Sequence, residues 1–290
     1  MVELVAARYD QTLGDDYIKL AQALILCTLP YSPTSETRIV RRARMGDGSF
    51  LTVTFVAVSE GVLMPYGADR KLLHWLIDRA IRADDPYVPW SSALEFQREM
   101  GIRQSGRSTR QVRERFTRIA GLVIQIKRNN AEVTAQNTFP IIEASYLPNS
   151  LSEGASDQQC PLPSLGDRFG VLLHRPLFED LKRHKAVMPR RLWLEIDGPT
   201  AVQDLVLWLS YRCYSAASET VIPWSALREQ FPSEDTNPHR IRQHARKAVA
   251  ALQALWPGIR LEYHDSGILI DRAAAPMLDD DISKNRLRRL

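Results

Sequence analysis

The chain has 290 residues, 44% of them hydrophobic, which allows two domains with buried cores. Its formal net charge of +4 is mildly basic, and its three cysteines are too scattered for a metal site or a disulfide framework, which fits a reducing cytoplasm. No signal peptide opens the chain, and no apolar run reaches the roughly 18–20 residues that cross a bilayer. These features exclude a secreted disulfide scaffold and a membrane protein, and we expect a soluble cytoplasmic protein.

The first elements are a helix, a hairpin and a second helix. Residues 15–29 carry apolar side chains at the spacing of a helix with a wide buried face. Residues 37–59 alternate between apolar and polar positions on both sides of Asp47 and Gly48, which predicts a β-hairpin. Residues 68–82 follow as an amphipathic helix.

Residues 88–127 carry the clearest pattern of the first half. A turn leads into a short helix, a polar loop, a helix crowded with arginine and an alternating strand, which is the order of a helix-turn-helix with a strand behind it. Residues 132–142 return as a second strand, so the pair is a candidate wing. From residue 98 to residue 128 there are nine basic residues and two acidic ones, and such a concentration is typical of proteins that bind polyanions.

Residues 147–166 are rich in Pro, Ser, Gly and Asp without any periodicity, which predicts a linker. A second unit follows. Its predicted elements are a strand at 169–173, a helix at 176–184, a helix at 199–214, a helix-turn-helix at 224–255 and a hairpin around 264–266.

Four tryptophans indicate that the two units are copies. Trp75 precedes Trp90 by 15 residues, and Trp208 precedes Trp224 by 16. The first of each pair lies in LLHWL or LVLWL, and the second lies in PWSSAL or PWSAL. This agreement in register predicts an internal duplication of a unit of about 100 residues. The tryptophans themselves are expected to pack the first helix of each unit against the following turn.

The predicted fold class is therefore α+β, with two tandem winged-helix domains related by internal duplication and joined by a flexible linker. Residues 1–146 form the N-terminal winged-helix domain with its leading helix, and residues 167–272 form the C-terminal DNA-binding domain. The linker spans 147–166, and residues 273–290 are expected to be a disordered tail.

The second helix of each helix-turn-helix is the candidate DNA-reading element. In both copies an apolar stripe leaves a polar face that mixes Arg and Lys with Thr, Gln and His, which bond to phosphates and base edges. The alternative for either helix is a solvated face without a ligand. The candidate DNA-binding residues, which include the preceding loops and the first wing, are Arg107, Ser108, Thr109, Arg110, Arg113, Thr117, Arg118, Lys127, Arg128, His239, Arg240, Arg242, Gln243, Arg246 and Lys247.

The sequence resembles the plasmid-encoded RepA replication initiators. The resemblance rests on LMPYGADRKLLHWL, VPWSSALEFQREMGI, LFEDLKRHKAVMP, AVQDLVLWLSYR and IPWSALREQF, and it covers roughly residues 62–270. It implies a bacterial cytoplasmic protein with two winged-helix domains that binds direct repeats (iterons) at a plasmid origin and helps to open the duplex. It also implies recruitment of host replication proteins (the host initiator and the replicative helicase), homodimerisation through the N-terminal domain, and repression of the protein's own promoter.

No catalytic constellation is present in the sequence, so we expect no enzyme, cofactor or metal. The six histidines include no His-x-His pair for a nicking enzyme, and no Gly-rich loop ends in Gly-Lys-Ser/Thr. Two further functions stay open beside the replication initiator. One is a transcriptional regulator that uses the same helices, and the other is an interaction module whose basic helices bind acidic proteins.

Overall fold

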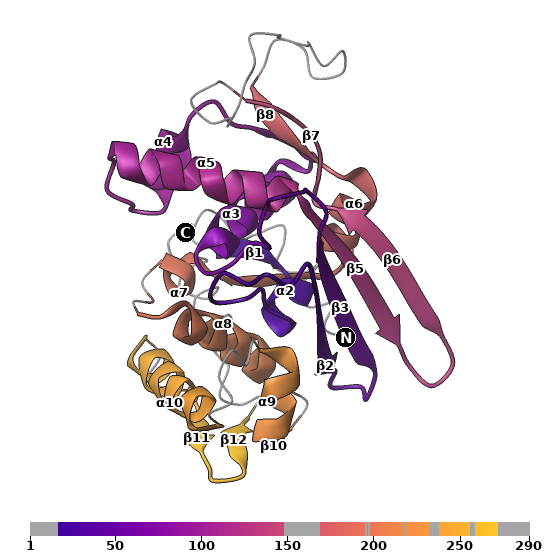
Figure 1. The fold of residues 1–290 in the computed structure, drawn as a ribbon. Coiled ribbons are helices and arrows are strands. Elements are labelled where there is room, and N and C mark those ends of the chain that lie inside the picture. Colours follow the sequence, from indigo (N-terminus) through magenta and orange to yellow (C-terminus); the bar gives the residue numbers. More distant parts are fainter. Residues whose placement is uncertain are drawn as a thin grey trace, which may run out of the picture.

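The computed structural model describes residues 17–147, 169–194, 196, 198–216, 218–231, 238–255 and 259–271. Most of the predicted linker and the whole predicted tail lie outside these residues. The described part is a mixed α and β structure (Figure 1). Its elements are β1 (Tyr17–Ala21), α2 (Gln22–Leu26), β2 (Arg38–Arg44), β3 (Phe50–Ala57), α3 (Asp69–Ala83), β4 (Tyr87–Pro89), α4 (Ala93–Glu99), α5 (Gly106–Ala120), β5 (Leu122–Asn129), β6 (Thr134–Pro140), β7 (Ile142–Tyr146), β8 (Gly170–Leu173), α6 (Arg175–Arg183), β9 (Lys185–Pro189), α7 (Arg190–Leu194), α8 (Thr200–Ser215), β10 (Thr220–Pro223), α9 (Trp224–Gln230), α10 (Pro238–Leu255), β11 (Leu261–Tyr263) and β12 (Gly267–Ile270).

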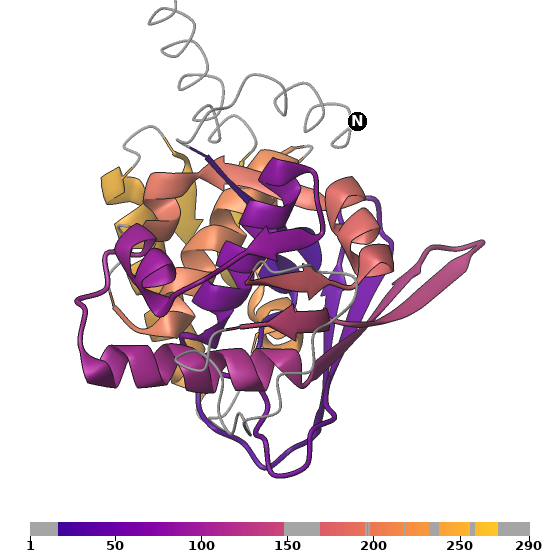
Figure 2. The same cartoon turned by 90° about the horizontal axis from the view of Figure 1, so that it is seen from above.

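The largest sheet has four antiparallel strands in the order β2-β3-β5-β6. Its first hairpin is the predicted one, and Gly48 takes the positive φ of 84° that the turn requires. Leu51, Val53 and Phe55 alternate along β3 on the buried face. The β5–β6 hairpin projects from the body as a long two-stranded arm (Figure 2). The predicted wing is therefore continuous with the first hairpin.

The helix predicted for residues 15–29 is wrong over its first half. Residues Tyr17–Ala21 form β1, and only Gln22–Leu26 are helical. β1 pairs antiparallel with β9, and four of its five side chains are buried. A strand that is covered on both faces has an almost continuous apolar run, which periodicity alone cannot distinguish from a buried helix.

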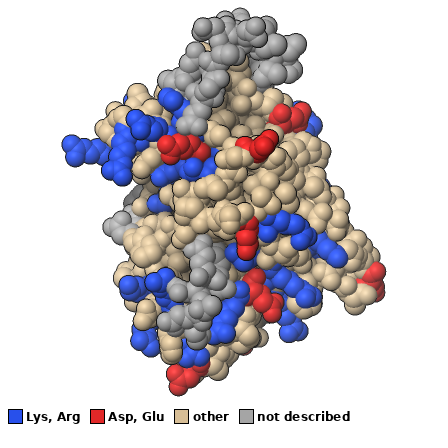
Figure 3. All heavy atoms as spheres, in the orientation of Figure 1, with Lys and Arg blue, Asp and Glu red and all other residues tan. Residues whose placement is uncertain are grey.

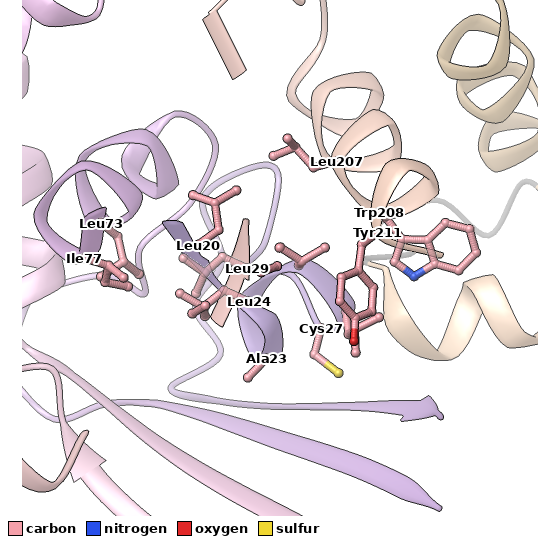
Figure 4. Close-up of a cluster of buried hydrophobic side chains, with 14 of the residues drawn as sticks. Leu20, Ala23, Leu24, Cys27, Leu29, Leu73, Ile77, Leu207, Trp208 and Tyr211 are labelled. Atoms are coloured by element: carbon pink, nitrogen blue, oxygen red, sulfur yellow. The ribbon is translucent and has the colours of Figure 1, made fainter. Parts of the chain in front are cut away.

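Strands from both sides of the predicted linker pair with each other. β8 lies between β4 and β7, and β9 pairs with β1, so residues 170–189 complete sheets that residues 17–146 begin. Helix α6 also contacts α3. The hydrophobic core is one continuous cluster of side chains. Figure 4 shows Leu20, Leu24, Leu73 and Ile77 on one side of it and Leu207 of α8 on the other.

The order helix, strand, helix, helix, strand, strand occurs twice, as α3-β4-α4-α5-β5-β6 and as α8-β10-α9-α10-β11-β12. Trp75 meets Phe96 edge-to-face with ring centroids 5.6 Å apart and planes at 75°, and Trp208 meets Phe231 with the same two values. The sheets differ, however. β10 pairs with β12 of its own unit, whereas β4 pairs with β8 and the β5–β6 hairpin joins β2 and β3. The order of the elements and the geometry of the Trp–Phe contacts are therefore the same in the two units, whereas the strand pairing differs.

A buried ion pair joins the two repeated units. Arg70 of α3 is 5% exposed, and its guanidinium pairs with Asp204 of α8, which is 4% exposed. Arg70 Nε donates to the backbone oxygen of Gly67, and its Nη2 donates to those of Leu29 and Pro30, each at 2.8 Å. Each of these contacts lies inside the molecule, so Arg70 fixes α3, α8 and the chain after α2 relative to one another.

Candidate nucleic-acid interface

Helix α10 has one apolar face toward the molecule and one basic, hydrophilic face toward solvent. Ala245, Ala248, Val249 and Leu252 are buried and pack toward α8. The exposed side chains of this helix are those of His239, Arg240, Gln243, Arg246, Lys247 and Ala250, with Gln253 and Ala254 in its last turn. The predicted residues of this helix therefore lie together, except that Arg242 is half-buried. The loop before this helix, residues 232–237, lies outside the described residues.

Helical geometry gathers part of this set into a single stripe. With about 100° between successive residues, His239, Gln243, Arg246 and Ala250 fall within a sector of roughly 60°. Arg240 and Lys247 lie beside that stripe on one flank. Gln and Arg can each bond two acceptor or donor atoms of one base, and an Ala methyl group can contact the thymine methyl group. Ala250 was not among the predicted residues, because a lone alanine carries no sequence signal for this role.

Two arginines of α10 are held by aromatic rings. The guanidinium carbon of Arg246 lies 4.6 Å from the centroid of Tyr263, and that of Arg242 lies 5.6 Å from the centroid of Trp224. The two rings lie against each other with centroids 5.1 Å apart. A cation over a ring face is attracted by the ring quadrupole, so this aromatic pair restricts where both guanidinium groups can lie. Periodicity within α10 could not predict this pairing, because Tyr263 lies on β11.

Trp224 also fixes the β11–β12 hairpin to the start of α9. Its indole Nε1 donates to the backbone oxygen of Asp265 at 2.8 Å, and its backbone N–H donates to Ser266 at 3.3 Å. A Cβ atom at Gly267 would lie 2.1 Å from the backbone oxygen of Ile222, so only glycine allows this strand contact. The hairpin therefore has a defined position beside α10.

Helix α5 begins at a reciprocal serine cap. The backbone N–H of Ser108 donates to Ser105 Oγ at 3.1 Å, and the backbone N–H of Ser105 donates to Ser108 Oγ at 2.9 Å. The Ser108 hydroxyl also accepts a hydrogen bond from Gln97 Nε2 at 3.1 Å and lies 3.0 Å from the backbone oxygen of Arg103. This cap explains why α5 starts at Gly106, directly after Ser105. Ser108, predicted as a phosphate contact, is engaged in the cap.

The basic side chains of α5 separate into an exposed group and an internal group. Arg107 and Arg110, near the start of the helix, are exposed, and Thr109 and Arg113 are half-buried. Thr117 donates its hydroxyl hydrogen to the backbone oxygen of Arg113 at 3.2 Å. Only the first turns of α5 therefore offer cations to a ligand in the way that the sequence predicted.

Arg118 does not belong to the exposed group. Its Nε and Nη2 donate to the two carboxylate oxygens of Asp69 at 2.7 and 3.0 Å, and Asp69 is 2% exposed. Burial lowers the pKa of Arg118, but the hydrogen bond and the charge of Asp69 outweigh burial, so the pKa is raised. Arg115 lies 3.7 Å from the same carboxylate. A DNA contact by Arg118 would break both of its hydrogen bonds to this buried carboxylate, so we exclude Arg118 from the interface.

The two basic residues predicted for the first wing point to opposite faces of β5. Arg128 donates to both carboxylate oxygens of Asp180 on α6 at 2.9 and 3.1 Å, so we exclude it as well. Lys127 is half-buried and lies on the other face of the strand. Asp69 and Asp180 are each about 50 residues from the arginine they bind, and no local pattern pointed to them.

Lysine and arginine side chains gather at three places on one side of the molecule (Figure 3). They surround the free end of α5, they lie over the four-stranded sheet, and they surround α10. Among the described residues, no group of three or more His, Cys, Asp and Glu side chains could hold a metal ion. No helix in that part of the chain has the length and apolar character needed to cross a membrane.

A search of solved structures finds that this chain is similar to structures of RctB. No family model matches the sequence, and no curated protein matches it. The crystal structure of domains 2 and 3 of RctB is 13% identical in sequence with a TM-score of 0.49, over 86% of this chain and 94% of that one. A selenomethionine derivative of the same two domains gives 13% identity and a TM-score of 0.48, over 84% and 95% of the two chains. A likeness at this level assigns no function to this chain.

Proposed function

We propose that this chain binds double-stranded DNA in a sequence-specific manner, with α10 in the major groove and the start of α5 at a second site on the same duplex. The observation that carries the proposal is the exposed stripe of His239, Gln243, Arg246 and Ala250, flanked by Arg240 and Lys247. Such a stripe offers base-reading groups at its centre and phosphate-binding cations at its edge. The short helix α9 before it and the hairpin after it complete the order of a winged helix.

The proposed role of this binding is initiation of plasmid replication. The sequence resemblance to RepA initiators supports it, as does the repetition of the helices in two units, which suits a protein that binds successive stretches of direct repeats. In this role the chain binds origin repeats, promotes opening of the duplex and recruits the host initiator and replicative helicase. A homodimer that represses the protein's own promoter belongs to the same proposal. A transcriptional regulator without a replication role is the alternative.

Footprinting on DNA that flanks the gene tests both roles. An initiator is expected to protect several direct repeats of about one to two helical turns beside an AT-rich tract, whereas a regulator protects a palindromic promoter site alone. If neither direct repeats nor a palindromic site is protected, both the initiator role and the regulator role are wrong.

Replacement of Arg246 tests the reading helix itself. Arg246→Ala is expected to weaken binding to the protected sequence by about 1–3 kcal/mol, because a lost bidentate contact to a base costs that much. Fluorescence anisotropy against the protected sequence and a scrambled duplex measures the change. Arg175→Ala, which removes an exposed arginine on α6, is the matched control and is expected to bind like wild type. Equal binding by all three proteins would show that α10 is not the reading helix.

A further inference from the structure

The four-stranded sheet has a solvent face that neither basic helix uses. Side chains alternate along its strands, and those on the face away from the core are exposed or half-buried, apart from Thr54. We call this set the outer sheet face. It consists of Arg38, Val40, Arg42, Arg44, Phe50, Thr52, Thr54, Val56, Val123, Gln125, Lys127, Asn129, Thr134, Gln136, Thr138 and Pro140.

None of the residues in these four strands is acidic. The whole chain, by contrast, has 34 acidic residues against 38 Lys and Arg, so an ordinary surface of this protein mixes both signs. Three arginines of β2, which are Arg38, Arg42 and Arg44, are exposed on the outer sheet face, and Lys127 joins them from β5. Within the described residues, none of these four cations forms an ion pair with a carboxylate.

A cation on the opposite face of the same sheet behaves differently. Arg128 is the neighbour of Lys127, points toward α6 and is neutralised by both oxygens of Asp180. The sheet thus pairs Arg128 with an acid and leaves the four outward cations without one. Their field is directed at the solvent, where it attracts an anion.

Strand pairing arranges the outward cations in a flat array. Arg42 and Arg44 are two residues apart on β2, which is about 7 Å, and Arg38 lies about 13 Å from Arg42 along the strand. The register places Arg42, Thr52 and Lys127 in one row across β2, β3 and β5, so Lys127 lies two strands, or about 10 Å, from Arg42. Thr52 lies between Arg42 and Lys127 in this row, and the amide groups of Gln125 and Gln136 lie beside Lys127. Phosphate oxygens accept hydrogen bonds from all of these groups.

We propose that the outer sheet face binds the phosphate backbone of duplex DNA as a third contact, beside those of α10 and α5. Figure 3 shows the basic side chains over the sheet on the same side of the molecule as those around the two helices. The proposal rests on the proposed function. It adds a surface that contacts the phosphate backbone of the DNA and makes no contact with the bases.

The aromatic content of the outer sheet face favours a duplex over a single strand. A surface that binds single strands stacks successive bases on aromatic rings. Phe50 is the one aromatic side chain of the outer sheet face, and the guanidinium carbon of Arg42 already lies 4.0 Å from its centroid. The surface therefore offers cations and polar groups without a stacking platform.

The test compares charge-matched variants of the full chain on defined probes. Arg42→Ala/Arg44→Ala removes two cations of the outer sheet face, and Arg175→Ala/Arg183→Ala removes two exposed arginines of α6. Binding to a 30-bp duplex of mixed sequence and to a 30-nucleotide oligo-dT is measured by anisotropy at several salt concentrations. The β2 variant is expected to bind the duplex about 10-fold or more weakly at ~0.1 M salt, with a log–log salt slope shallower by about 2. The α6 variant is expected to match wild type.

Duplex affinity and a salt slope equal to wild type in the β2 variant would overturn the proposal, and so would a loss confined to oligo-dT. If the β2 variant does not fold, Lys127→Ala, on a different strand, is tested in its place. It is expected to make the log–log salt slope of duplex binding shallower by about 1. If wild type itself binds no duplex, the proposed function fails. If wild type binds and only Arg246→Ala weakens specific binding, the outer sheet face alone is refuted.

Discussion

At the scale of single residues, Arg246 depends on the ring beneath it. Tyr263→Leu removes that ring and is expected to weaken binding to the protected sequence about 2- to 5-fold, because an exposed cation–π contact contributes about 0.5–1 kcal/mol. Tyr263→Phe keeps the ring and is expected to bind like wild type. Titration of both variants against one labelled duplex measures the difference. A Phe variant as weak as the Leu variant would mean that the hydroxyl group, not the ring, supports Arg246.

His74 makes the stability of the fold sensitive to pH. It is 3% exposed, and its Nδ1 has no hydrogen-bond partner among the described residues. Burial, together with the nearby charge of Arg70, lowers the pKa of His74 to about 3. The unfolded chain binds a proton at the ordinary pKa of 6.5 while the folded chain does not. The stability contributed by the neutral imidazole is therefore complete above pH 6.5 and is lost as the pH falls below it.

Urea unfolding at pH 7 and pH 5 checks this effect. Between these two pH values the free energy of unfolding of wild type is expected to fall by about 2 kcal/mol more than that of His74→Gln. The comparison uses the pH difference of each protein, so a constant loss of stability in the variant does not disturb it. Equal pH differences would show that His74 takes up its proton without unfolding.

At the scale of elements, the start of α5 depends on its serine cap. Ser108→Ala removes the hydroxyl that bonds Ser105 and Gln97, and it is expected to lower the free energy of unfolding by about 1 kcal/mol. DNA affinity at a temperature where the variant is fully folded is expected to stay within about 2-fold of wild type. Thermal and urea unfolding measure the first effect, and anisotropy measures the second. A large loss of affinity without a loss of stability would restore Ser108 as a phosphate contact.

The periodic helices were the most predictable elements. The spacing of apolar residues located α3, α5 and α10, and the alternation around Asp47 and Gly48 located the first hairpin, because these signals are local. The same local signals misassigned β1, whose two buried faces imitate a helix. They also could not show that β4 pairs with β8, because that pairing joins residues about 80 positions apart.

The residues of the candidate site also fall into two groups, those that local sequence signals predict and those whose surroundings depend on tertiary contacts. The exposed residues of α10 follow from its periodicity and composition, and they lie together as expected. In the sequence, nothing distinguishes Arg118 and Arg128 from arginines that are exposed. Only the tertiary structure brings Asp69 to Arg118 and Asp180 to Arg128. The outer sheet face was missed for a related reason. Its cations come from β2 and β5, and these strands become linked only when β3 pairs with both.

At the scale of the whole molecule, the Arg70–Asp204 pair holds the two units together. Asp204→Ala is expected to lower the free energy of unfolding by about 3–5 kcal/mol, because it leaves a buried guanidinium without its counter-ion. The double variant Arg70→Met/Asp204→Leu removes both charges and is expected to recover most of that loss. Urea unfolding of the single and double variants gives the coupling between the two positions. Losses that simply add would show that the two side chains stabilise the fold independently.

The β1–β9 pairing also sets an order of events during synthesis. Tyr17 leaves the ribosome more than 170 residues before its partner Pro189. At 5–20 residues per second this interval lasts roughly 10–30 s. Throughout that time the nascent chain carries an apolar strand with both edges open, which is the kind of segment that chaperones protect and that other chains can capture. The part of the fold that contains β1 can therefore be completed only after the ribosome has translated β9.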